Sequence, residues 1–389
     1  MEPRPIAILG ASGSIGTTTL AVARAHPGLV RVASMASHRK WRELVAPAAE
    51  FGVNTLAFGD PAAAQEARAS GAFAAGTRIL AGTEGLTEAA CLPEVRTVVS
   101  AVVGTAGLSP TLAALRAGKD VALASKELLV LAGRFVTEAA AKGGGRLLPV
   151  DSEHNALHQL LRNRPREEVS RLVLTASGGA FRDTPVEKLK DVTPEQALRH
   201  PNWSMGPKVT IDSATMANKG LEIVEATWLF GVAQDRVDVV VHPQSVIHAS
   251  VTLSDGSMQA LLSPPSMAFP IQDCLLQPRR PACPAPGLDL TAAHSLTMAP
   301  PDPRRYPCLG VARAAAAAGA CAPAAFNAAN EVAVEAFMSG RLRFTGIAEV
   351  AGRTMERGWT KEPGSLDDVL AADAEARRLA QDHSAALRI

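Results

Sequence analysis

The stretch that decides the fold lies near the N-terminus, where residues 6–16 read IAILGASGSIG. An apolar run typical of a buried strand is followed at once by glycines at positions 10, 13 and 16 and by a helical pattern. Glycines let the backbone turn sharply and approach a pyrophosphate, and the helix N-terminus adds free N–H groups. In this context the GxxGxxG spacing, a variant of GxGxxG, predicts a dinucleotide-binding loop. The alternative is a helix start that merely requires small residues.

Residues 5–151 alternate short apolar runs with amphipathic ones. The expected strands are 6–9, 30–34, 55–58, 78–81, 97–103, 120–124 and 146–150, with helices such as 109–117 and 127–142 between them. Continuously apolar strands are typical of a sheet that is covered on both faces. The alternation therefore predicts an α/β fold with a parallel, doubly wound, Rossmann-like sheet.

The rest of the chain changes character twice. Residues 152–276 mix expected helices (155–161 and 215–230) with expected strands (172–175, 237–241, 246–253 and 258–262), and Asp255-Gly256 is typical of a hairpin turn. Residues 277–304 are rich in proline, and residues 305–389 are helical and rich in alanine. We therefore predict a Rossmann-like domain (1–151), an α+β domain (152–276), an extended linker (277–304) and a C-terminal helical domain (305–389).

Composition excludes several classes of protein. Lys and Arg total 39 against 38 Asp and Glu, so no global field would hold nucleic acid or an anionic membrane. The five cysteines form no CxxC pair, which indicates free thiols in a reducing compartment. The N-terminus has no signal-peptide pattern, and the alanine-rich stretch 311–329 is interrupted by Arg313, Pro323 and Asn327. These features predict a cytoplasmic protein with a small-molecule ligand.

The end of the second expected strand indicates which dinucleotide binds. An NAD site places an acidic residue there for the ribose 2′-hydroxyl, whereas this chain reads Ser37-His38-Arg39-Lys40. Arg39 and Lys40 suit a 2′-phosphate, which favours NADP(H). The alternative is an ordinary basic helix start, since Lys and Arg are common at surfaces.

Carboxylates cluster after the last parallel strand, where residues 149–154 read PVDSEH. Asp151 and Glu153 are two residues apart, so on extended backbone they would face the same side and supply half of a hard-cation site. The segment 212–222, DSATMANKGLE, offers Glu222 as a third carboxylate, with Lys219 one helical turn before it. The alternative for each segment taken alone is a helix cap followed by a surface ion pair.

Three further segments carry polar groups. Ser177-Gly178-Gly179 follows an expected strand and suits a phosphate nest, with a plain turn as the alternative. Residues 199–207, RHPNWSMGP, are predicted to form a mobile lid, with a surface loop anchored by Trp203 as the alternative. The histidines of residues 242–248, HPQSVIH, are interpreted as structural, because no metal-ligand spacing accompanies them.

Taken together, these blocks resemble the 1-deoxy-D-xylulose 5-phosphate reductoisomerase family. The resemblance rests on GASGSIG (10–16), SKE (125–127), PVDSEHNA (149–156), ASGGAFR (176–182), HPNWSMG (200–206), DSATMANKGLE (212–222), HPQSVIH (242–248), RYPCL (305–309) and NAANE (327–331). They occur in the family's order over nearly the whole chain.

The resemblance implies a homodimeric enzyme that uses NADPH and a divalent metal. The implied reaction isomerises 1-deoxy-D-xylulose 5-phosphate and reduces the resulting aldehyde to 2-C-methyl-D-erythritol 4-phosphate, an early step of the non-mevalonate isoprenoid (MEP) pathway. The metal would be Mg²⁺ or Mn²⁺, with Co²⁺ as a further candidate. It also implies an NADPH-binding first domain, a second domain for metal and substrate, and a helical third domain.

The resemblance also assigns roles to individual residues. The metal ligands would be Asp151, Glu153 and Glu222, with Lys126 and Ser152 in contact with substrate beside them. The phosphate pocket would comprise Ser177, Ser213, Asn218 and Lys219, and the lid would contribute His200, Trp203 and Met205. The cofactor would contact Ser12, Gly13, Ser14, Ile15, Glu127 and Gly206, with Ser125 at a further cofactor contact.

Several positions depart from the family pattern. Ser125 stands where many members carry Asn, Ala180 replaces a common Pro, and the segment around Met267 is atypical. Residues 37–40 also differ from the usual Gly-basic-Asn pattern, which leaves open the residue that meets the 2′-phosphate. None of these departures removes an expected metal ligand.

Two points of mechanism and two rival functions stay open. A retro-aldol and aldol sequence is not distinguished from a direct 1,2 shift, and both Glu153 and Lys126 are candidates for the general base. One rival is an NADP dehydrogenase of the homoserine or aspartate-semialdehyde type, which would work without metal. The other is a non-catalytic NADPH sensor, against which the joint presence of Asp151, Glu153, Glu222 and Lys219 argues.

Overall fold

A computed structural model of the chain describes residues 2–291 and 295–388. The backbone contacts divide these residues into two units. The first contains the described residues through Leu128, then Arg134–His158 and Ser266–Gly287. The second contains Leu129–Gly133, Gln159–Pro265 and the described residues from Leu288 onward.

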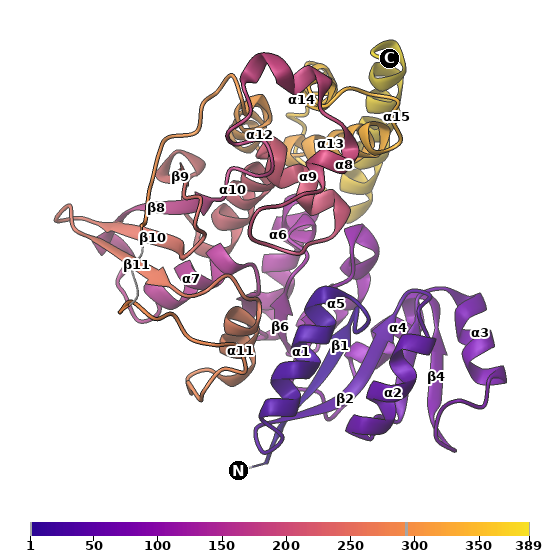
Figure 1. Cartoon of the computed structure of the whole chain (residues 1–389). Coiled ribbons are helices and arrows are strands. Elements are labelled where there is room, and N and C mark those ends of the chain that lie inside the picture. Colours follow the sequence, from indigo (N-terminus) through magenta and orange to yellow (C-terminus); the bar gives the residue numbers. More distant parts are fainter. Residues whose placement is uncertain (1, 292–294, 389) are drawn as a thin grey trace. The chain divides into compact units, whose positions relative to one another are not determined.

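The first unit is built on a seven-stranded parallel sheet (Figure 1). Its strands are β1 (Arg4–Leu9), β2 (Val30–Ser37), β3 (Thr55–Phe58), β4 (Arg78–Ala81), β5 (Thr97–Ser100), β6 (Asp120–Leu123) and β7 (Leu147–Pro149). They lie in the order β4-β3-β2-β1-β5-β6-β7, and every neighbouring pair is parallel. The doubly wound α/β fold is confirmed, and each strand lies within a few residues of its predicted position.

Helices connect these strands and bury the two faces of the sheet. They are α1 (Ser14–Ala25), α2 (Arg42–Phe51), α3 (Pro61–Ala69), α4 (Gly82–Ala90), α5 (Leu108–Arg116), α6 (Glu127–Gly143) and α7 (Ser152–Leu161), with a 3₁₀ turn η1 (Gly104–Gly107) before α5. The core combines strand residues such as Ile8 and Met35 with helix residues such as Leu20 and Leu44. Because all strands are parallel, their carboxyl ends share one edge of the sheet, where ligands bind in folds of this kind.

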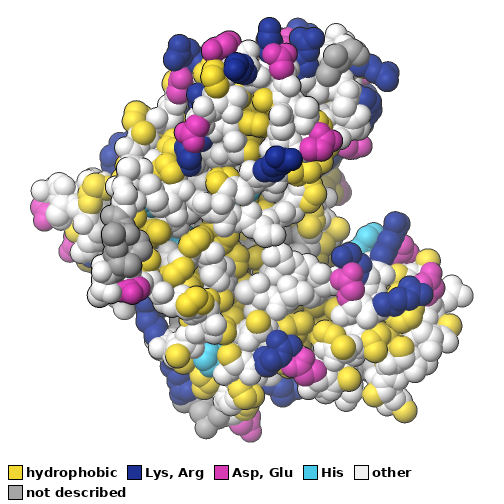
Figure 2. Space-filling view, viewed as in Figure 1, with side chains coloured by type: hydrophobic (Ala, Val, Ile, Leu, Met, Phe, Trp, Pro, Cys, Tyr) yellow, Lys and Arg dark blue, Asp and Glu magenta, His cyan; other side chains and the backbone are white. Residues whose placement is uncertain are grey.

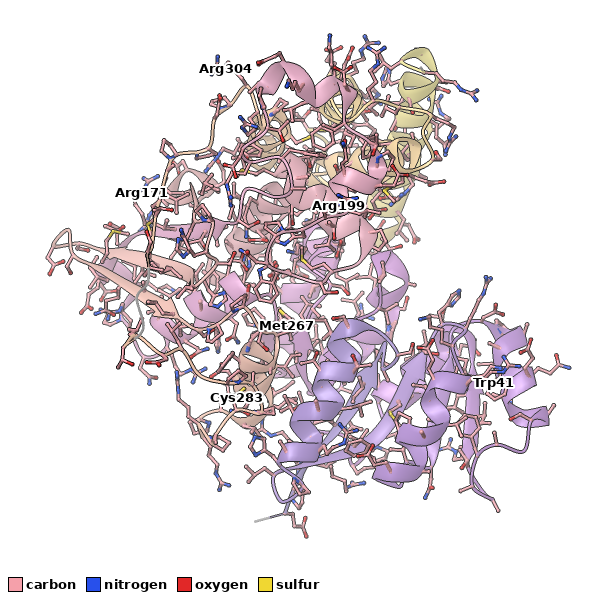
Figure 3. The ribbon with its side chains drawn as sticks, in the orientation of Figure 1. Trp41, Arg171, Arg199, Met267, Cys283 and Arg304 are labelled. Atoms are coloured by element: carbon pink, nitrogen blue, oxygen red, sulfur yellow. The ribbon has the colours of Figure 1, made fainter. Side chains whose placement is uncertain are left out.

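The helix α11 (Ala268–Leu276) belongs to the first unit, although it follows the second sheet in sequence. Its buried residues Ile271, Cys274 and Leu275 are part of the same core as β1 and β2. Met267 and Cys283, both labelled in Figure 3, flank this helix and pack against that core. The sequence pattern instead placed residues 266–276 in the α+β domain. Local patterns do not reveal the contacts of α11, because its partners are far away along the chain.

The second unit contains a four-stranded mixed sheet. Its strands are β8 (Val169–Ala176), β9 (Val237–Val241), β10 (Ile247–Leu253) and β11 (Met258–Leu262), in the order β11-β10-β8-β9. The β8–β9 pair is parallel, and the other two pairs are antiparallel. The β10–β11 hairpin turns at Asp255-Gly256 as predicted, with Gly256 at a φ of +86°.

Helices make up the rest of the second unit. The short elements are η2 (Arg166–Glu168), η3 (Val186–Asp191), α8 (Pro194–Ala197) and η4 (Gln234–Arg236), and the longer ones are α9 (Pro207–Thr215), α10 (Ala217–Phe230), α12 (Pro307–Ala318), α13 (Ala322–Met338), α14 (Gly346–Met355) and α15 (Leu366–Ala386). The core of these helices contains Phe326, Phe337 and Trp359. The prediction of a helical segment from residue 305 is confirmed.

The predicted helix 215–230 is wrong at its start. Met216 adopts the left-handed conformation, with φ 59° and ψ 13°, and this ends α9 and begins α10. The Thr215 side chain accepts a hydrogen bond from the backbone N–H of Ala217 at 3.2 Å, which supports the turn. The break places Ser213 on the last turn of one helix and Asn218 on the first turn of the next.

Residues 277–304 are mostly without regular structure, and Ala299 forms an antiparallel bridge with Val241; residues 292–294 lie outside the described residues. The two compact units do not coincide with the four expected segments, whose boundaries therefore stay a prediction.

The helices carry charges of both signs, in agreement with the near-equal numbers of basic and acidic residues. Over the C-terminal helices, Figure 2 shows Lys and Arg side chains interspersed with Asp and Glu. Ion pairs such as Arg353–Glu349 and Arg378–Asp382 account for part of this pattern. Among the described residues, no helix has both the length and the apolar character that crossing a membrane requires.

Gly220 is expected to be intolerant of any side chain. It lies on α10, and a Cβ atom there would come within 2.2 Å of the Ala312 Cβ on α12. We expect Gly220→Val to lower the free energy of unfolding by about 1–3 kcal/mol, because overpacking forces the two helices apart. Gly352→Ala on α14 is the matched control, because nothing lies within 4 Å of its added Cβ. Urea unfolding should show the control at or above wild-type stability; equal losses in both variants would contradict the packing argument.

Candidate active site

The glycine loop of the first unit has the geometry of a dinucleotide-binding turn. Gly10 has a φ of +93°, and a Cβ there would lie 2.3 Å from the carbonyl oxygen of Ala101. A Cβ at Gly16 would lie 2.3 Å from the carbonyl oxygen of Gly10, so both positions require glycine. Gly13 and Ser14, by contrast, are exposed at the start of α1. The Gly13 N–H donates to the Gly10 carbonyl at 3.0 Å, and no side chain caps the start of α1, so this helix N-terminus suits a phosphate.

Arg39 and Lys40 follow the end of β2, directly before Trp41, which is labelled in Figure 3. Both are exposed, and each is paired with a carboxylate: Arg39 Nε lies 2.6 Å from Asp60, and Lys40 Nζ lies 3.1 Å from Glu43. These are surface ion pairs, which contribute little and exchange easily. The position suits a 2′-phosphate, and the role of these two residues stays a prediction.

The segment after β6 holds Ser125, Lys126 and Glu127. The Ser125 hydroxyl donates to the carbonyl of Val102 at 2.6 Å, which ties the end of β6 to the segment after β5. Lys126 is buried and forms an ion pair with Asp151. Glu127 begins α6 and is half-buried. Lys126 and Asp151, which lie far apart in sequence, are therefore brought together within the first unit.

The carboxylate turn, Asp151-Ser152-Glu153, follows β7. The expectation of extended backbone is wrong here, because α7 begins at Ser152 and Glu153 lies in its first turn. All three side chains are half-buried, and Ser152 donates a hydrogen bond to Glu153. Two hydrogen bonds to the preceding strand fix the turn. The Asn155 amide donates to the carbonyl of Pro149 at 3.1 Å, and Cys274 donates to the same oxygen at 3.2 Å. Carboxylate and hydroxyl oxygens in a sheltered turn are the donors that Mg²⁺ and Mn²⁺ prefer.

In the second unit, the start of α10 carries a buried ion pair. Lys219 Nζ lies 2.6 Å from Glu222, and their side chains are only 6% and 0% exposed. Asn218 donates to the other oxygen of the same carboxylate at 2.5 Å. A cation suited to phosphate and a carboxylate suited to metal therefore lie within one helical turn.

The Ser177-Gly178-Gly179 loop follows β8 and packs on the end of α9. Gly178 and Gly179 have φ values of +85° and +68°, and a Cβ at Gly179 would lie 2.5 Å from the Ala214 Cα. Ser213, next to that contact, donates its hydroxyl to the carbonyl of Val209 at 2.9 Å. Consecutive left-handed glycines beside hydroxyl groups match the predicted phosphate nest.

His200 meets the same loop. Its Nδ1 accepts hydrogen bonds from the backbone N–H groups of Asn202 and Trp203, at 3.2 and 3.0 Å. The proton of the neutral ring is therefore on Nε2, which donates to the Ser177 hydroxyl oxygen at 3.0 Å. Burial, and secondarily the positive charge of Lys219, lowers the pKa of His200 from 6.5 to about 4. The imidazole is thus neutral at physiological pH and has a defined tautomer.

The predicted lid runs from Arg199, labelled in Figure 3, to Pro207 and has no regular structure before α9. The Asn202 amide holds it to the HPQSVIH segment by donating to the Pro243 carbonyl at 2.6 Å and to Ser245 at 2.8 Å. The Trp203 ring packs edge-on against His248, with 6.3 Å between centroids. Met205 is half-buried, and Gly206 is exposed as the N-cap of α9.

His242 lies inside the second unit and holds the HPQSVIH segment, which the lid contacts. It is fully buried, and its Nε2 accepts hydrogen bonds from the backbone N–H groups of Val246 and Ile247. Its Nδ1 donates to the carbonyl of Thr297 at 2.9 Å. Both ring nitrogens are therefore engaged by backbone, which agrees with a structural role.

Comparison with known families decides the assignment. The family model described as 1-deoxy-D-xylulose 5-phosphate reductoisomerase matches residues 6–133. The C-terminal domain model of the same description matches residues 147–230, and the DXP reductoisomerase C-terminal domain model matches residues 262–379. The chain belongs to the 1-deoxy-D-xylulose 5-phosphate reductoisomerase family. The resemblance seen in the sequence is confirmed.

Individual members of this reductoisomerase family are similar over nearly their whole length. The chain is 49% identical over 384 residues to 1-deoxy-D-xylulose 5-phosphate reductoisomerase of Ralstonia pickettii (strain 12J), which covers 98% of this chain and 97% of that protein. The solved enzyme of Zymomonas mobilis in complex with NADPH is 40% identical, with a TM-score of 0.92 over 98% of this chain and 99% of that one. A DOX-P reductoisomerase structure with NADPH, fosmidomycin and magnesium is 39% identical, with a TM-score of 0.89 and 98% coverage of both chains.

Sequence reasoning missed several residues that hold the site in this member of the reductoisomerase family. Asn330 of the NAANE block donates to the buried carboxylate of Asp212 at 2.7 Å and so ties α13 to α9. Tyr306 and Arg305 of the RYPCL block donate hydrogen bonds to the backbone carbonyls of Gly178 and Phe181, in the segment that follows β8. Both blocks were visible as motifs, but their spacing gave no sign of which partners they contact.

The protonation of His200 gives a testable pH dependence. Because its pKa in the folded state is about 4, we expect no titration of this ring near pH 6.5 and a neutral Nε2–H tautomer above about pH 5. Unfolded chains bind a proton at this residue as the pH falls through 6.5, whereas the folded chain does not until about pH 4. His200 therefore lowers the free energy of unfolding progressively between pH 6.5 and 4 and has no effect above that range.

Heteronuclear NMR of ¹⁵N-histidine-labelled protein measures this directly. His200→Gln assigns the resonance, since it removes one imidazole signal from the spectrum. A ring that titrates near 6.5, or an Nδ1–H tautomer at neutral pH, would contradict the assigned hydrogen bonds.

Proposed function

We propose that this chain converts 1-deoxy-D-xylulose 5-phosphate to 2-C-methyl-D-erythritol 4-phosphate, with NADPH as reductant and a divalent metal as cofactor, in the non-mevalonate (MEP) pathway. Membership of the reductoisomerase family supports this reaction. The observation that carries it is the start of α10, where Lys219 and Glu222 are buried together beside the Ser177–Gly179 loop and His200. This arrangement can receive an anion and a cation at neighbouring positions.

The substrate phosphate would bind to groups of the second unit alone. Lys219 supplies a positive charge, and Ser177, Ser213 and Asn218 supply polar side chains around it. A phosphate accepts strong, charge-assisted hydrogen bonds from such donors. Because this group is remote from the reacting carbons, its binding energy can hold the rest of the substrate in the geometry of the transition state.

The metal would be held by Asp151, Glu153 and Glu222. Their oxygen donors fit Mg²⁺ or Mn²⁺, and Co²⁺ is a further candidate. Asp151 forms an ion pair with Lys126, and Glu222 forms one with Lys219. When bound, such an ion acts as a Lewis acid on the carbonyl and adjacent hydroxyl of the substrate. Lys126 lies beside Asp151, and Ser152 lies beside Glu153; both would orient the same substrate oxygens.

NADPH would occupy the carboxyl edge of the parallel sheet. Its pyrophosphate fits the loop Ser12, Gly13, Ser14 and Ile15, where the N–H groups of α1 are exposed. Arg39 or Lys40 would meet the 2′-phosphate, and Ser125, Glu127 and Gly206 would add further contacts. The cofactor supplies a hydride to the aldehyde that the rearrangement produces.

The lid would exclude water from the reacting carbons. Trp203 and Met205 are its large apolar side chains. His200 joins the lid to the Ser177–Gly179 loop through its hydrogen bond to Ser177. A closed lid keeps reactive fragments in place and reserves the hydride for the aldehyde. Glu153 and Lys126 remain the two candidates for the general base, by retro-aldol and aldol steps or by a direct shift.

We further propose a cytoplasmic homodimer. All five cysteines are free thiols, which suits a reducing compartment. The strand β11 is an edge of the second sheet, and Met258 and Leu262 on it are 57% and 37% exposed. Exposed edges with apolar side chains pair readily with another copy, so β11 is the proposed interface.

The reaction is tested by NADPH absorbance with 1-deoxy-D-xylulose 5-phosphate, with and without Mg²⁺ or Mn²⁺. We expect oxidation only when both the substrate and a metal are present, with 2-C-methyl-D-erythritol 4-phosphate as the product. Metal-independent oxidation would favour a simple dehydrogenase. No oxidation by folded protein that still binds NADPH would reject the substrate.

The metal site is tested by Glu222→Gln. We expect activity to fall at least about 100-fold, because even partners of metal ligands typically cost 10–100-fold. Mn²⁺ affinity, followed by electron paramagnetic resonance of the free ion, should fall as well, whereas NADPH fluorescence titrations should match wild type. Glu349→Gln, which removes an exposed partner of Arg353, is the matched control. Unchanged Mn²⁺ affinity in Glu222→Gln would remove this residue from the ligand set.

Glu153→Gln separates the two candidate bases. We expect it to lose turnover if Glu153 moves the proton, and a Glu153→Gln protein with full turnover would leave Lys126 as the candidate. The comparison is made at saturating Mn²⁺, so that weakened metal binding does not imitate the loss of a base.

A further inference from the structure

In the second unit, three side chains hold the backbone carbonyls of the segment 177–181, which follows β8. Arg182 donates to the Ser177 carbonyl at 3.2 Å, Tyr306 donates to the Gly178 carbonyl at 2.9 Å, and Arg305 donates to the Phe181 carbonyl at 2.7 Å. Arg305 also donates to the carbonyl of Thr184. None of these contacts is used by the proposed chemistry, yet together they fix the orientation of the peptide groups next to Ser177.

Tyr306 makes the most sheltered of these contacts. Only 3% of the residue is exposed, and it stands directly before α12, whose first residue is Pro307. Burial is the largest cause that raises the pKa of Tyr306, to about 12, so its hydroxyl keeps its proton throughout the physiological range. The hydroxyl is therefore a permanent donor to Gly178.

A fixed Gly178 carbonyl also fixes the neighbouring N–H. The carbonyl of Gly178 and the N–H of Gly179 belong to one planar, trans peptide group, so they point in opposite directions. That N–H donates to the Ser177 hydroxyl oxygen at 3.1 Å, and His200 Nε2 donates to the same oxygen at 3.0 Å. Ser177 thus accepts two hydrogen bonds, and its own proton is left to be donated to another acceptor.

We propose that Tyr306 is a positioning residue for the substrate phosphate. Through the Gly178–Gly179 peptide it orients the Ser177 hydroxyl as a donor to the phosphate oxygens. The glycines are essential to this arrangement, because both have positive φ and a Cβ at Gly179 would collide with α9. The inference rests on the proposed function for the identity of the substrate, but the phosphate contact is testable without turnover.

The first test is Tyr306→Phe, which keeps the ring and removes only the hydroxyl. We expect the dissociation constant for inorganic phosphate, measured by calorimetry on the full chain, to rise about threefold to tenfold, as the loss of one buried hydrogen bond would produce. KM for 1-deoxy-D-xylulose 5-phosphate should rise by the same factor, with kcat within about twofold of wild type. An unchanged phosphate affinity would overturn the proposal.

Thr354→Val is the matched control for a lost buried hydroxyl. Thr354 is fully buried on α14 and donates to the carbonyl of Val350 at 2.8 Å. It should lower thermal stability as much as Tyr306→Phe does and leave phosphate affinity unchanged. A loss of phosphate affinity in both variants would show a general effect of stability and would overturn the proposal.

A double-mutant cycle with Ser177→Ala tests the route. If Tyr306 acts through Ser177, Tyr306→Phe should change phosphate affinity by less than about twofold in the Ser177→Ala background. Equal effects in both backgrounds would mean that Tyr306 does not act through this serine.

A measurement on the unmutated fold remains decisive if Tyr306→Phe does not fold. Tyr306 is the single tyrosine of the sequence, so 3-fluorotyrosine incorporation gives one ¹⁹F resonance. We expect inorganic phosphate to shift it in the otherwise wild-type chain and not in Ser177→Ala. No shift at saturating phosphate would overturn the proposal. If the wild-type chain binds phosphate with these features but does not oxidise NADPH with the sugar phosphate, the proposed function fails and the role of Tyr306 stands.

Discussion

The buried ion pair between Lys219 and Glu222 is the constraint on which the second unit depends. Removing ions from water is costly, and breaking such a pair by deleting one partner typically costs about 3–5 kcal/mol. Here the pair is held because α10 begins at a left-handed Met216 and packs so closely on α12 that Gly220 has no room for a Cβ. Packing thus places an ammonium and a carboxylate one turn apart in a buried environment. The same helix can then offer a cation to a phosphate and an anion to a metal.

The first unit also pairs a lysine with a carboxylate, on other elements. Lys126 and Asp151 form an ion pair between the segments that follow β6 and β7. The turn that carries Asp151 and Glu153 is fixed by Asn155 and Cys274, which both donate to the Pro149 carbonyl. Neutral donors thus fix the backbone, and lysines balance the carboxylates. In both units the charged groups stand on rigid elements, as a preorganised site requires.

The sequence predicted what depends on local patterns. The parallel strand β3 was located at its observed ends, because a continuous apolar run bounded by turns identifies a buried strand. Local patterns failed at Met216, where a left-handed turn divides a helical run, and at Glu153, where a helix begins earlier than the strand pattern suggested. They also could not connect Tyr306 with Gly178, or Asn330 with Asp212, because those partners lie more than 100 residues apart. Such contacts follow from tertiary packing, and only the fold reveals them.

Anomalous diffraction from crystals grown with Mn²⁺ and inorganic phosphate tests most directly whether the carboxylates of the two units bind one ion. We expect a single strong manganese peak coordinated by oxygens of Asp151, Glu153 and Glu222, with Lys219 turned from Glu222 toward a bound phosphate. A manganese ion held elsewhere, or held by Asp151 and Glu153 while Glu222 stays paired with Lys219, would contradict the proposed metal site.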